Sequence, residues 1–236
     1  MAAYAESAEL YDALYRWKDY AAEALTLREL IEANARREVV TLLDVACGSG
    51  AHLVHLAAFY QCTGLDLSDG LLEAARAKLP DGTFVLGDMR DFALGRTFGA
   101  VVCLFSAIGY VQTVDGLRQA VAAMTRHVAP GGVLLVEPWF SPDEARDGHI
   151  SILTVEDADR KIVRASVSKI RDGVSELDFH YLVLTPDGVQ HFSEMHKLGL
   201  FTDAEYCAAF TDAGLNVTRD EHGLDGRGLY VGVKPV

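Results

Sequence analysis

The chain has 236 residues, a formal net charge of −13 and 50% hydrophobic residues. At this length one α/β domain can bury its core without disulfides, and the four cysteines show no paired spacing, so we expect a reduced, cytoplasmic protein. The acidic charge repels phosphate backbones, and nowhere do about 18 apolar residues run together, so we expect neither a nucleic-acid partner nor a membrane. The first dozen residues lack the basic start and apolar stretch of a signal peptide, so we expect none.

The N-terminal segment, residues 5–37, carries apolar side chains at helical spacing, which predicts helices. Tyr11, Trp17 and Tyr20 lie in this segment. They are interpreted either as core aromatics between the helices or as part of a helical cap over a bound ligand, which the tyrosine hydroxyls reach. The sequence leaves both interpretations open.

From residue 39 onward, short apolar strands alternate with amphipathic helices. The strands are predicted at 39–46, 62–67, 83–87, 99–105 and 131–138, and the helices at 51–60, 68–79 and 115–128. Strand, helix, strand in this order predicts an α/β fold of Rossmann-like type, with a parallel sheet and right-handed crossovers.

After about residue 150 the pattern changes to long alternating strands joined by good hairpin-turn sequences, Asp172-Gly173 and Pro186-Asp187-Gly188. The strands are predicted at 161–170, 175–184 and 189–201. We interpret them as an antiparallel meander that serves as a lid. A helix at 203–214 and two strands at 215–220 and 228–233 follow.

Gly48 and Gly50 lie where the first strand turns into the next helix. Glycine permits a left-handed turn and lets a ligand approach the backbone, and ligands bind at the carboxyl ends of the strands of an open parallel sheet. The P-loop pattern GxxxxGK[ST] is absent from the sequence, and Leu53 stands where the dinucleotide fingerprint has its third glycine. The pattern therefore favours a nucleoside without a pyrophosphate.

Two acidic residues at strand ends support a nucleoside. Asp66 ends the second strand, 16 residues after Gly50, where a carboxylate can accept from both hydroxyls of a ribose, and Asp88 ends the third, where it can meet an adenine amino group. A charge-assisted hydrogen bond of this kind contributes about 1.5–3 kcal/mol. Asp44, at the end of the first strand, either supports the ligand as Asp66 and Asp88 do or is structural and braces the glycine loop through backbone N–H groups; in both cases it is part of the site.

The segments DVACGSG, LDLS and GDMRDF resemble class I methyltransferases that use S-adenosylmethionine. Along the whole chain, KDYAAEA, FSAIGY, EPW, FHYLV, LFTDAEY, AAFTDAGL and GRGLYVG are similar to the N,N-dimethyltransferases that finish nucleotide-linked amino sugars in macrolide antibiotic biosynthesis, of the desosamine and mycaminose type. Those enzymes carry a Gly/Lys-rich insertion just before KDY, whereas this chain has Tyr15-Arg16-Trp17.

The resemblance implies a seven-stranded methyltransferase sheet and three parts of the chain. Residues 1–149 form the N-terminal helical cap and the S-adenosylmethionine-binding core, residues 150–200 the antiparallel lid over the acceptor, and residues 201–236 the final helix and two strands. The expected cofactor-binding residues are Tyr20, Asp44, Ala46, Gly48, Gly50, Asp66, Leu67, Asp88, Met89, Phe105 and Ser106. The expected substrate-binding residues are Trp17, Trp139, Tyr181 and Arg227.

Arg227 matches the position where the amino-sugar enzymes present an arginine near the phosphates of the nucleotide; the alternative is a solvated turn charge. The catalytic candidates are Glu137 at the end of the fifth strand, Tyr11, Tyr110 facing the acceptor, and His180. His180 shares a strand face with Leu182 and Leu184, and this face is either core or the inner surface of the lid.

The sequence contains two further pairs of nearby histidines. His191 and His196 differ in parity and should point to opposite faces of their strand. We expect no metal, because His52 and His55 share a helix face but have no third ligand in the sequence.

The first functional expectation is methyl transfer to the amine of a nucleotide-linked amino sugar, a small-molecule substrate. The alternative is C- or N-methylation of an aromatic natural product such as an indole at C3, which needs Glu137 or His180 as a base and a ring held between Trp17 and Tyr110. Two other classes of function are a nucleoside-binding module without chemistry and a nucleic-acid methyltransferase. Methyltransferases that act on base amino groups usually have an Asn/Asp-Pro-Pro-aromatic motif after the fourth strand, where this chain has FSAIGY, which disfavours the second class. The oligomeric state stays open, a homodimer included.

Overall fold

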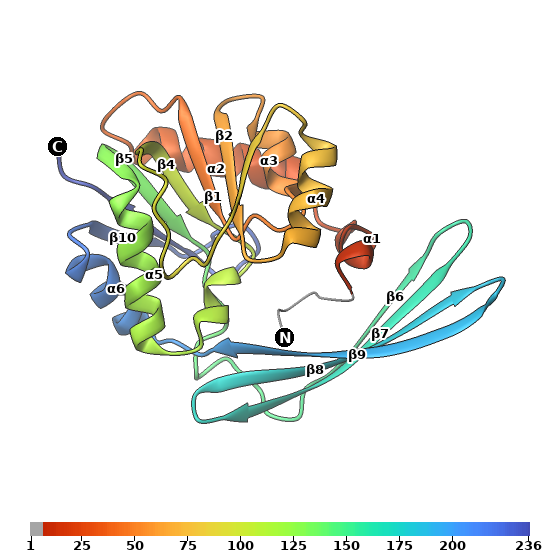
Figure 1. Ribbon diagram of the computed structural model, residues 1–236. Coiled ribbons are helices and arrows are strands. Elements are labelled where there is room, and N and C mark those ends of the chain that lie inside the picture. The colour runs from red at the N-terminus through yellow and green to blue at the C-terminus, as the bar shows by residue number, and fades with distance from the viewer. Residues whose placement is uncertain (1–6) are drawn as a thin grey trace.

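The computed structural model describes residues 7–236, which form two β-sheets and their surrounding helices (Figure 1). The first two residues of the predicted helical segment 5–37, and residues 1–6 of the predicted cap, lie outside the described residues. Within residues 7–236, no helix has the length and apolar character needed to cross a membrane.

The sequence predicted helices in the N-terminal segment 5–37, and this segment forms a short helical turn and two helices separated by a break. They are η1 (Ala8–Leu10), α1 (Tyr11–Tyr15) and α2 (Tyr20–Asn34). The carboxylate of Asp19 accepts a hydrogen bond from the backbone N–H of Ala22 and caps α2, so this helix begins anew after a break.

The larger sheet is built by the alternating region and the C-terminal segment. Its elements are β1 (Thr41–Val45), α3 (Ala51–Leu56), β2 (Gln61–Asp66), α4 (Asp69–Lys78), β3 (Thr83–Leu86), β4 (Phe98–Cys103), η2 (Ala107–Val111), α5 (Val114–Arg126), β5 (Val128–Val136), α6 (Asp203–Asp212), β10 (Asn216–Asp220) and β11 (Leu229–Val233). Among the described residues, this sheet has seven strands in the order β10-β11-β5-β4-β1-β2-β3. The first five strands in the sequence are parallel and β11 is antiparallel to both of its neighbours, so the predicted methyltransferase sheet is confirmed.

Helices cover both faces of the larger sheet. Leu117 and Val121 of α5 and Phe210 of α6 are fully buried against one face, and Leu27 of α2 and Leu53 of α3 are fully buried against the other. Burying one such side chain stabilises the fold by about 1.5–3 kcal/mol. The two layers of helices leave the carboxyl edge of the parallel strands accessible, and Asp66, Asp88 and Glu137 stand at this edge.

The smaller sheet is antiparallel and lies below the larger one in Figure 1. Its strands are β6 (Ile150–Glu156), β7 (Lys161–Arg171), β8 (Val174–Thr185) and β9 (Gly188–Gly199). Asp172 and Gly173 both have positive φ, as a tight hairpin turn requires. The sequence did not predict β6, because this edge strand is mostly exposed and lacks alternation. We call the sheet β6–β9 the lid sheet.

The inner face of the lid sheet packs on the N-terminal helices. Leu14 and Tyr15 of α1 form one apolar cluster with Ile162 of β7 and Tyr181 of β8, and Tyr181 stacks on Phe192 with ring centroids 4.7 Å apart. Figure 1 shows α1 between the two sheets. The helices therefore connect the lid sheet to the carboxyl edge of the larger sheet.

Candidate active site

The loop between β1 and α3 has a left-handed backbone at three positions. The φ angles are +62° at Ala46, +56° at Gly48 and +75° at Gly50. A Cβ at Gly48 would meet nothing closer than Tyr11, at 3.9 Å, whereas at Gly50 it would approach the Cβ of Ala75 in α4 to 3.1 Å. Gly48 lines a cavity at the edge of the sheet, and Gly50 permits the close approach of α4. The missing side chain thus leaves room for a ligand at Gly48 and for a neighbouring helix at Gly50.

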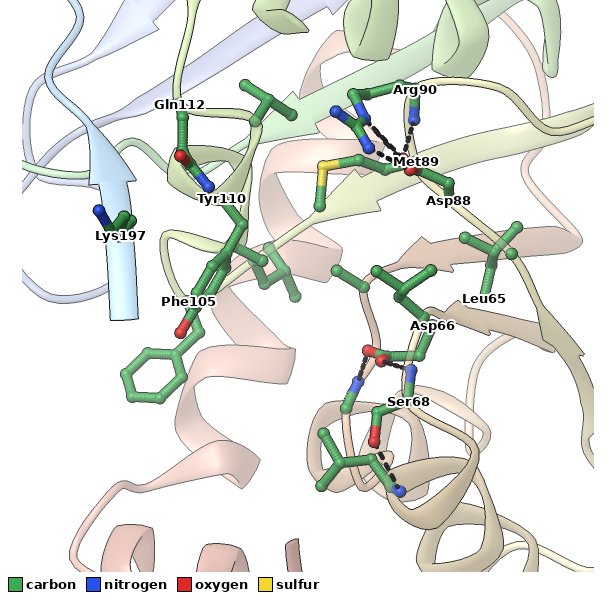
Figure 2. A pocket seen from close by; sticks show the side chains of 18 of the residues that line it. Leu65, Asp66, Ser68, Asp88, Met89, Arg90, Phe105, Tyr110, Gln112 and Lys197 are labelled. Carbon is green, nitrogen blue, oxygen red and sulfur yellow. Dashed lines mark hydrogen bonds and ion pairs between the residues drawn. The ribbon is translucent and has the colours of Figure 1, made fainter. Parts of the chain in front are cut away.

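A cavity of about 600 Å³ opens at the carboxyl edge of the larger sheet. Figure 2 shows Asp66, Ser68 and Met89 on one side of it and Tyr110 and Lys197 on the other. We call the first the cofactor side and the second the acceptor side. The expected cofactor residues that line the cavity are Ala46, Gly48, Asp66, Leu67, Asp88, Met89 and Phe105.

Asp66 is held in place by the backbone around it. Its two carboxylate oxygens accept hydrogen bonds from the N–H groups of Gly48 and Ser68, each at 2.8 Å. Burial raises the pKa of Asp66, and these backbone N–H groups oppose the rise. A carboxylate offers about four lone-pair sites, so the oriented group can still accept from the two hydroxyls of a ribose.

Asp88 also faces the cavity, with its carboxylate paired to Arg90 (Figure 2). Nη2 of Arg90 lies 2.6 Å from Oδ2 of Asp88, and this arginine lowers the pKa of Asp88. A contact between Asp88 and an adenine amino group stays a prediction.

A smaller pocket next to the cavity is lined by Tyr11, Tyr20, Asp44 and Phe105 among others. Asp44 is 2% exposed, and its Oδ1 has no hydrogen-bond partner among the described residues. Burial, followed by the nearby Asp66, raises its pKa well above the ordinary value. A buried oxygen without a donor is costly, so this pocket fits a ligand with a cationic or N–H donor, such as the ammonium group of S-adenosylmethionine.

Phe105 separates the cavity from a buried network of charges. Its φ is +52°, its N–H donates to Oε2 of Glu137 at 2.5 Å, and Nζ of Lys18 lies 4.4 Å from its ring centroid. Lys18 in turn pairs with Glu23 at 2.6 Å. Ionic groups therefore fix both the backbone and the ring of Phe105.

Glu137 is fully buried and does not line the cavity. Burial raises its pKa to about 7, and Arg227, whose Nη2 lies 3.5 Å from Oε1, opposes this rise. The structure places the carboxylate behind the backbone of Phe105, which does not fit the expected role of a base in contact with the acceptor.

The structure contradicts the expected orientation of His180. This residue lies on the exposed outer face of β8 and stacks on His191, with ring centroids 5.4 Å apart. The inner face carries the odd-numbered residues Phe179, Tyr181 and Val183, because these pack on the N-terminal helices. The prediction of His180 as a catalytic residue on the inner surface is therefore wrong.

Other expected site residues lie outside the cavity lining. Trp17 is 65% exposed, and Ser106 is buried with its hydroxyl donating to the carbonyl of Pro138 at 2.6 Å. Tyr181 is buried between the lid sheet and α1. Because Trp17 is exposed and His180 faces outward, the residues that the indole alternative needs around one ring are not brought together.

Trp139 and Arg227 lie together behind the cavity. The guanidinium of Arg227 is 5.6 Å from the ring centroid of half-buried Trp139, whose Nε1 has no hydrogen-bond partner among the described residues. Arg227 also pairs with Asp225, so the arginine is not a solvated turn charge.

His196 was not among the expected site residues. It is fully buried on the inner face of β9, and its Nδ1 lies 2.7 Å from the hydroxyl of Tyr110. The alternation along β9 correctly separated it from exposed His191, but only the structure shows which face is inner. The cavity-lining side chains of Arg90, Glu194 and Lys197 were likewise not expected.

A family described as "Methyltransferase domain" matches residues 42–132. The dTDP-3-amino-3,4,6-trideoxy-alpha-D-glucopyranose N,N-dimethyltransferase of Streptomyces venezuelae is 47% identical over 97% of this chain and 98% of its own length.

Two solved structures are similar over nearly the full chain. The crystal structure of DesVI from Streptomyces venezuelae has a TM-score of 0.92 and 46% identity, covering 98% of this chain and 99% of that one. An amino pentose methyltransferase from Micromonospora echinaspora, involved in calicheamicin biosynthesis and solved with S-adenosylmethionine bound, has a TM-score of 0.87 and 41% identity, covering 95% and 96%.

Proposed function

The chain belongs to the family of S-adenosylmethionine-dependent sugar N,N-dimethyltransferases, and we propose that it transfers two methyl groups to the amine of a dTDP-linked amino sugar during the biosynthesis of an antibiotic-type natural product. One observation carries this proposal. The methyltransferase-domain match ends at residue 132, whereas the similarity to the Streptomyces venezuelae enzyme covers 97% of the chain, lid sheet and C-terminal strands included. The cofactor-binding core is common to many methyltransferases, so similarity beyond it supports a shared acceptor class.

The cofactor side of the cavity binds and orients the methyl donor. When bound, S-adenosylmethionine supplies a methyl group that is already activated on a sulfonium. Asp66 accepts from the ribose hydroxyls, Asp44 accepts from the ammonium group, and the backbone at Gly48 allows close approach. Orienting two reactants in this way can supply roughly 7–11 kcal/mol of the barrier.

The acceptor side holds the nucleotide sugar. Tyr110 lines the cavity opposite Asp66, and its oxygen accepts from the neutral amine (Figure 2). The two phosphates of the nucleotide need cations in an acidic protein, and we assign this role to Lys197, which lines the cavity, and to Arg227. Nζ of Lys197 lies 2.6 Å from Oε1 of Glu176, and a phosphate would replace this carboxylate as its partner.

Arg227 lies behind the cavity and pairs with both Asp225 and Glu137. It would therefore move toward the cavity and exchange Asp225 for a phosphate, to which the guanidinium fork binds with two hydrogen bonds.

We also propose that the enzyme works in the cytoplasm as a homodimer. All four cysteines are free, which suits a reducing compartment. The outer face of the lid sheet exposes Ile150, Ile152 and Leu182, a set of apolar side chains that a second copy can cover. Light scattering should give twice the mass of one chain, and Ile152→Glu should give a monomer. A native monomer would contradict the dimer.

A panel of acceptors tests the proposed function. The protein is incubated with S-adenosylmethionine and a dTDP-linked 3-amino or 4-amino deoxysugar, the same sugar without its nucleotide, or indole. Mass spectrometry should find two added methyl groups on the dTDP-linked sugar, and much slower transfer to the free sugar because the phosphate contacts are lost. Turnover of indole, with none of the dTDP-linked amino sugars methylated, would overturn the proposal.

A further inference from the structure

We propose that Glu137 is a positioning residue with two tasks: one oxygen of its carboxylate holds Phe105 in the cavity wall, and the other holds Arg227 until a phosphate of the acceptor replaces it. This proposal rests on the proposed nucleotide-sugar acceptor. Glu137 lies directly after β5, and its N–H donates to the carbonyl of Cys103 at the end of the neighbouring strand β4. The parallel pairing of these two strands therefore places the carboxylate beside the loop that follows β4.

The first task concerns a loop with an unfavourable backbone. Phe105 and Ser106 have φ angles of +52° and +59°, which residues with a side chain rarely adopt. Such a backbone persists where neighbouring groups hold it. The N–H of Phe105 donates to Oε2 of Glu137 at 2.5 Å, and the hydroxyl of Ser106 donates to the carbonyl of Pro138 at 2.6 Å. Phe105 lines both the cavity and the smaller pocket, so Glu137 fixes a wall of the proposed cofactor site.

The second task concerns the loop between β10 and β11. Arg227 belongs to this loop, and its Nη2 lies 3.5 Å from Oε1 of Glu137. Gly226 and Gly228 on either side have φ angles of +90° and +82°, and glycine permits a local change of the backbone at both positions. The arginine can therefore leave Glu137 for a phosphate by a change that is confined to its own loop.

Four titratable or charged groups face Glu137. They are Arg227 and Asp225 in the loop before β11, Lys18 before α2, and the thiol of Cys103 in β4. Lys18 pairs with Glu23 at 2.6 Å, so its charge is already balanced. The thiol stays neutral, because burial raises the pKa of Cys103 far above its ordinary value. Within this set, Arg227 is the cation on which a carboxylate at Glu137 depends.

Release of Arg227 should make Glu137 take up a proton. Burial raises the pKa of this carboxyl to about 7, and Arg227 opposes the rise. A fully buried carboxylate that loses its cation is costly, so its pKa rises further and it binds a proton from solvent. Asp225 does not need this proton, because its side chain is 27% exposed and water can solvate it. The protonated carboxyl still has an oxygen that accepts from the N–H of Phe105, so the cavity wall stays in place.

Binding of an acceptor analogue without an amine tests the exchange at Arg227. A dTDP-linked hexose of this kind has no group that titrates near neutral pH, and at about pH 8 histidines of ordinary pKa are mostly neutral. Calorimetry of the whole protein in buffers of different ionisation enthalpy should show uptake of on the order of one proton per hexose bound. The affinity should weaken as the pH rises above 7, by at most about tenfold per pH unit.

Two variants show which group takes up the proton. Glu137→Gln keeps an oxygen that accepts from Phe105 but cannot titrate, so it should bind the hexose without proton uptake and with an affinity that does not change with pH. Glu221→Gln is the matched control, the same change at a glutamate of the same loop that is 78% exposed, and it should behave as the native protein does. Absence of proton uptake in the native protein, or uptake that persists in Glu137→Gln, would overturn the exchange.

The affinity for S-adenosylmethionine tests the hold on Phe105 without any acceptor. Glu137→Ala removes the accepting oxygen and should weaken cofactor binding about tenfold, whereas Glu137→Gln should bind normally. If Glu137→Ala does not fold, Glu137→Asp, which withdraws the oxygen by one carbon, takes its place. Native affinity in the shortened variant would overturn this task. If the hexose does not bind the native protein, the proposed function fails together with the exchange at Arg227, while cofactor binding still decides the hold on Phe105.

Discussion

The two sides of the cavity are assembled differently. On the cofactor side, each residue follows directly from a strand end, and Asp66 is held by backbone N–H groups of its own loop and of the neighbouring loop. On the acceptor side, Tyr110 meets His196 across 86 residues, through packing between η2 and the lid sheet. The first side is therefore set by local sequence, and the second depends on the register and docking of the lid sheet.

The largest expected effect lies on the cofactor side. Asp66→Ala removes the acceptor of the ribose hydroxyls and should weaken S-adenosylmethionine binding roughly tenfold to a hundredfold, measured by calorimetry. Asp69→Ala, which removes an exposed carboxylate of the same region, is the control and should bind normally. An unchanged affinity of Asp66→Ala for S-adenosylmethionine would contradict the assignment of Asp66 to the cofactor side.

Behind the cavity, Glu137 should make the stability of the protein depend on pH. Burial raises its pKa from 4.5 to about 7, so the folded protein holds this proton when the unfolded chain has lost it. The free energy of unfolding should fall as pH rises from 4.5 to about 7, on the order of 1–3 kcal/mol, relative to Glu137→Gln.

Urea denaturation of native and Glu137→Gln protein over this pH range checks the prediction. Below pH 4.5 the carboxyl is neutral in both states, so the difference between the two proteins should be constant there. Parallel stability curves across the whole range would contradict a buried carboxylate.

Substitutions of Arg227 and Trp17 distinguish a nucleotide-sugar acceptor from an aromatic acceptor. Arg227→Ala should raise the KM for a dTDP-linked amino sugar about tenfold, because a charge-assisted phosphate contact is lost. The affinity for S-adenosylmethionine should stay native. Trp17→Ala is the matched truncation of a residue that is 65% exposed and should leave KM unchanged. A strong effect of Trp17 together with a native KM in Arg227→Ala would instead favour an aromatic acceptor.

The smallest effect is expected for His180. Its imidazole lies on the outer face of the lid sheet, so His180→Ala should change kcat by less than about twofold, within the range of surface substitutions. Steady-state kinetics at several pH values measures this. A large loss of kcat would show that His180 takes part in catalysis and would contradict the observed orientation of β8.

The sequence predicted the cofactor side well because its signals are local. Gly48, Asp66 and Met89 line the cavity as expected, since a strand end and the next loop define them together. Gly50 shows the limit of this reasoning: it lies in the same loop, but its lack of a side chain is needed for packing against Ala75.

The acceptor side was less predictable for a physical reason. Both faces of β8 carry apolar side chains, Leu182 and Leu184 on one and Phe179 and Tyr181 on the other. The sequence gives the alternation, but the N-terminal helices decide which face is inner. The same long-range packing buries Lys18 beside Phe105 and His196 beside Tyr110, and no local pattern indicates either contact.

A crystal structure with S-adenosylhomocysteine and a dTDP-linked amino sugar would test the two-sided cavity most directly. The ribose hydroxyls should bind the carboxylate of Asp66, and the sugar nitrogen should lie about 3 Å from the hydroxyl of Tyr110, a normal hydrogen-bond distance. A nucleotide sugar bound on the outer face of the lid sheet, or an amine held away from Tyr110, would contradict the account.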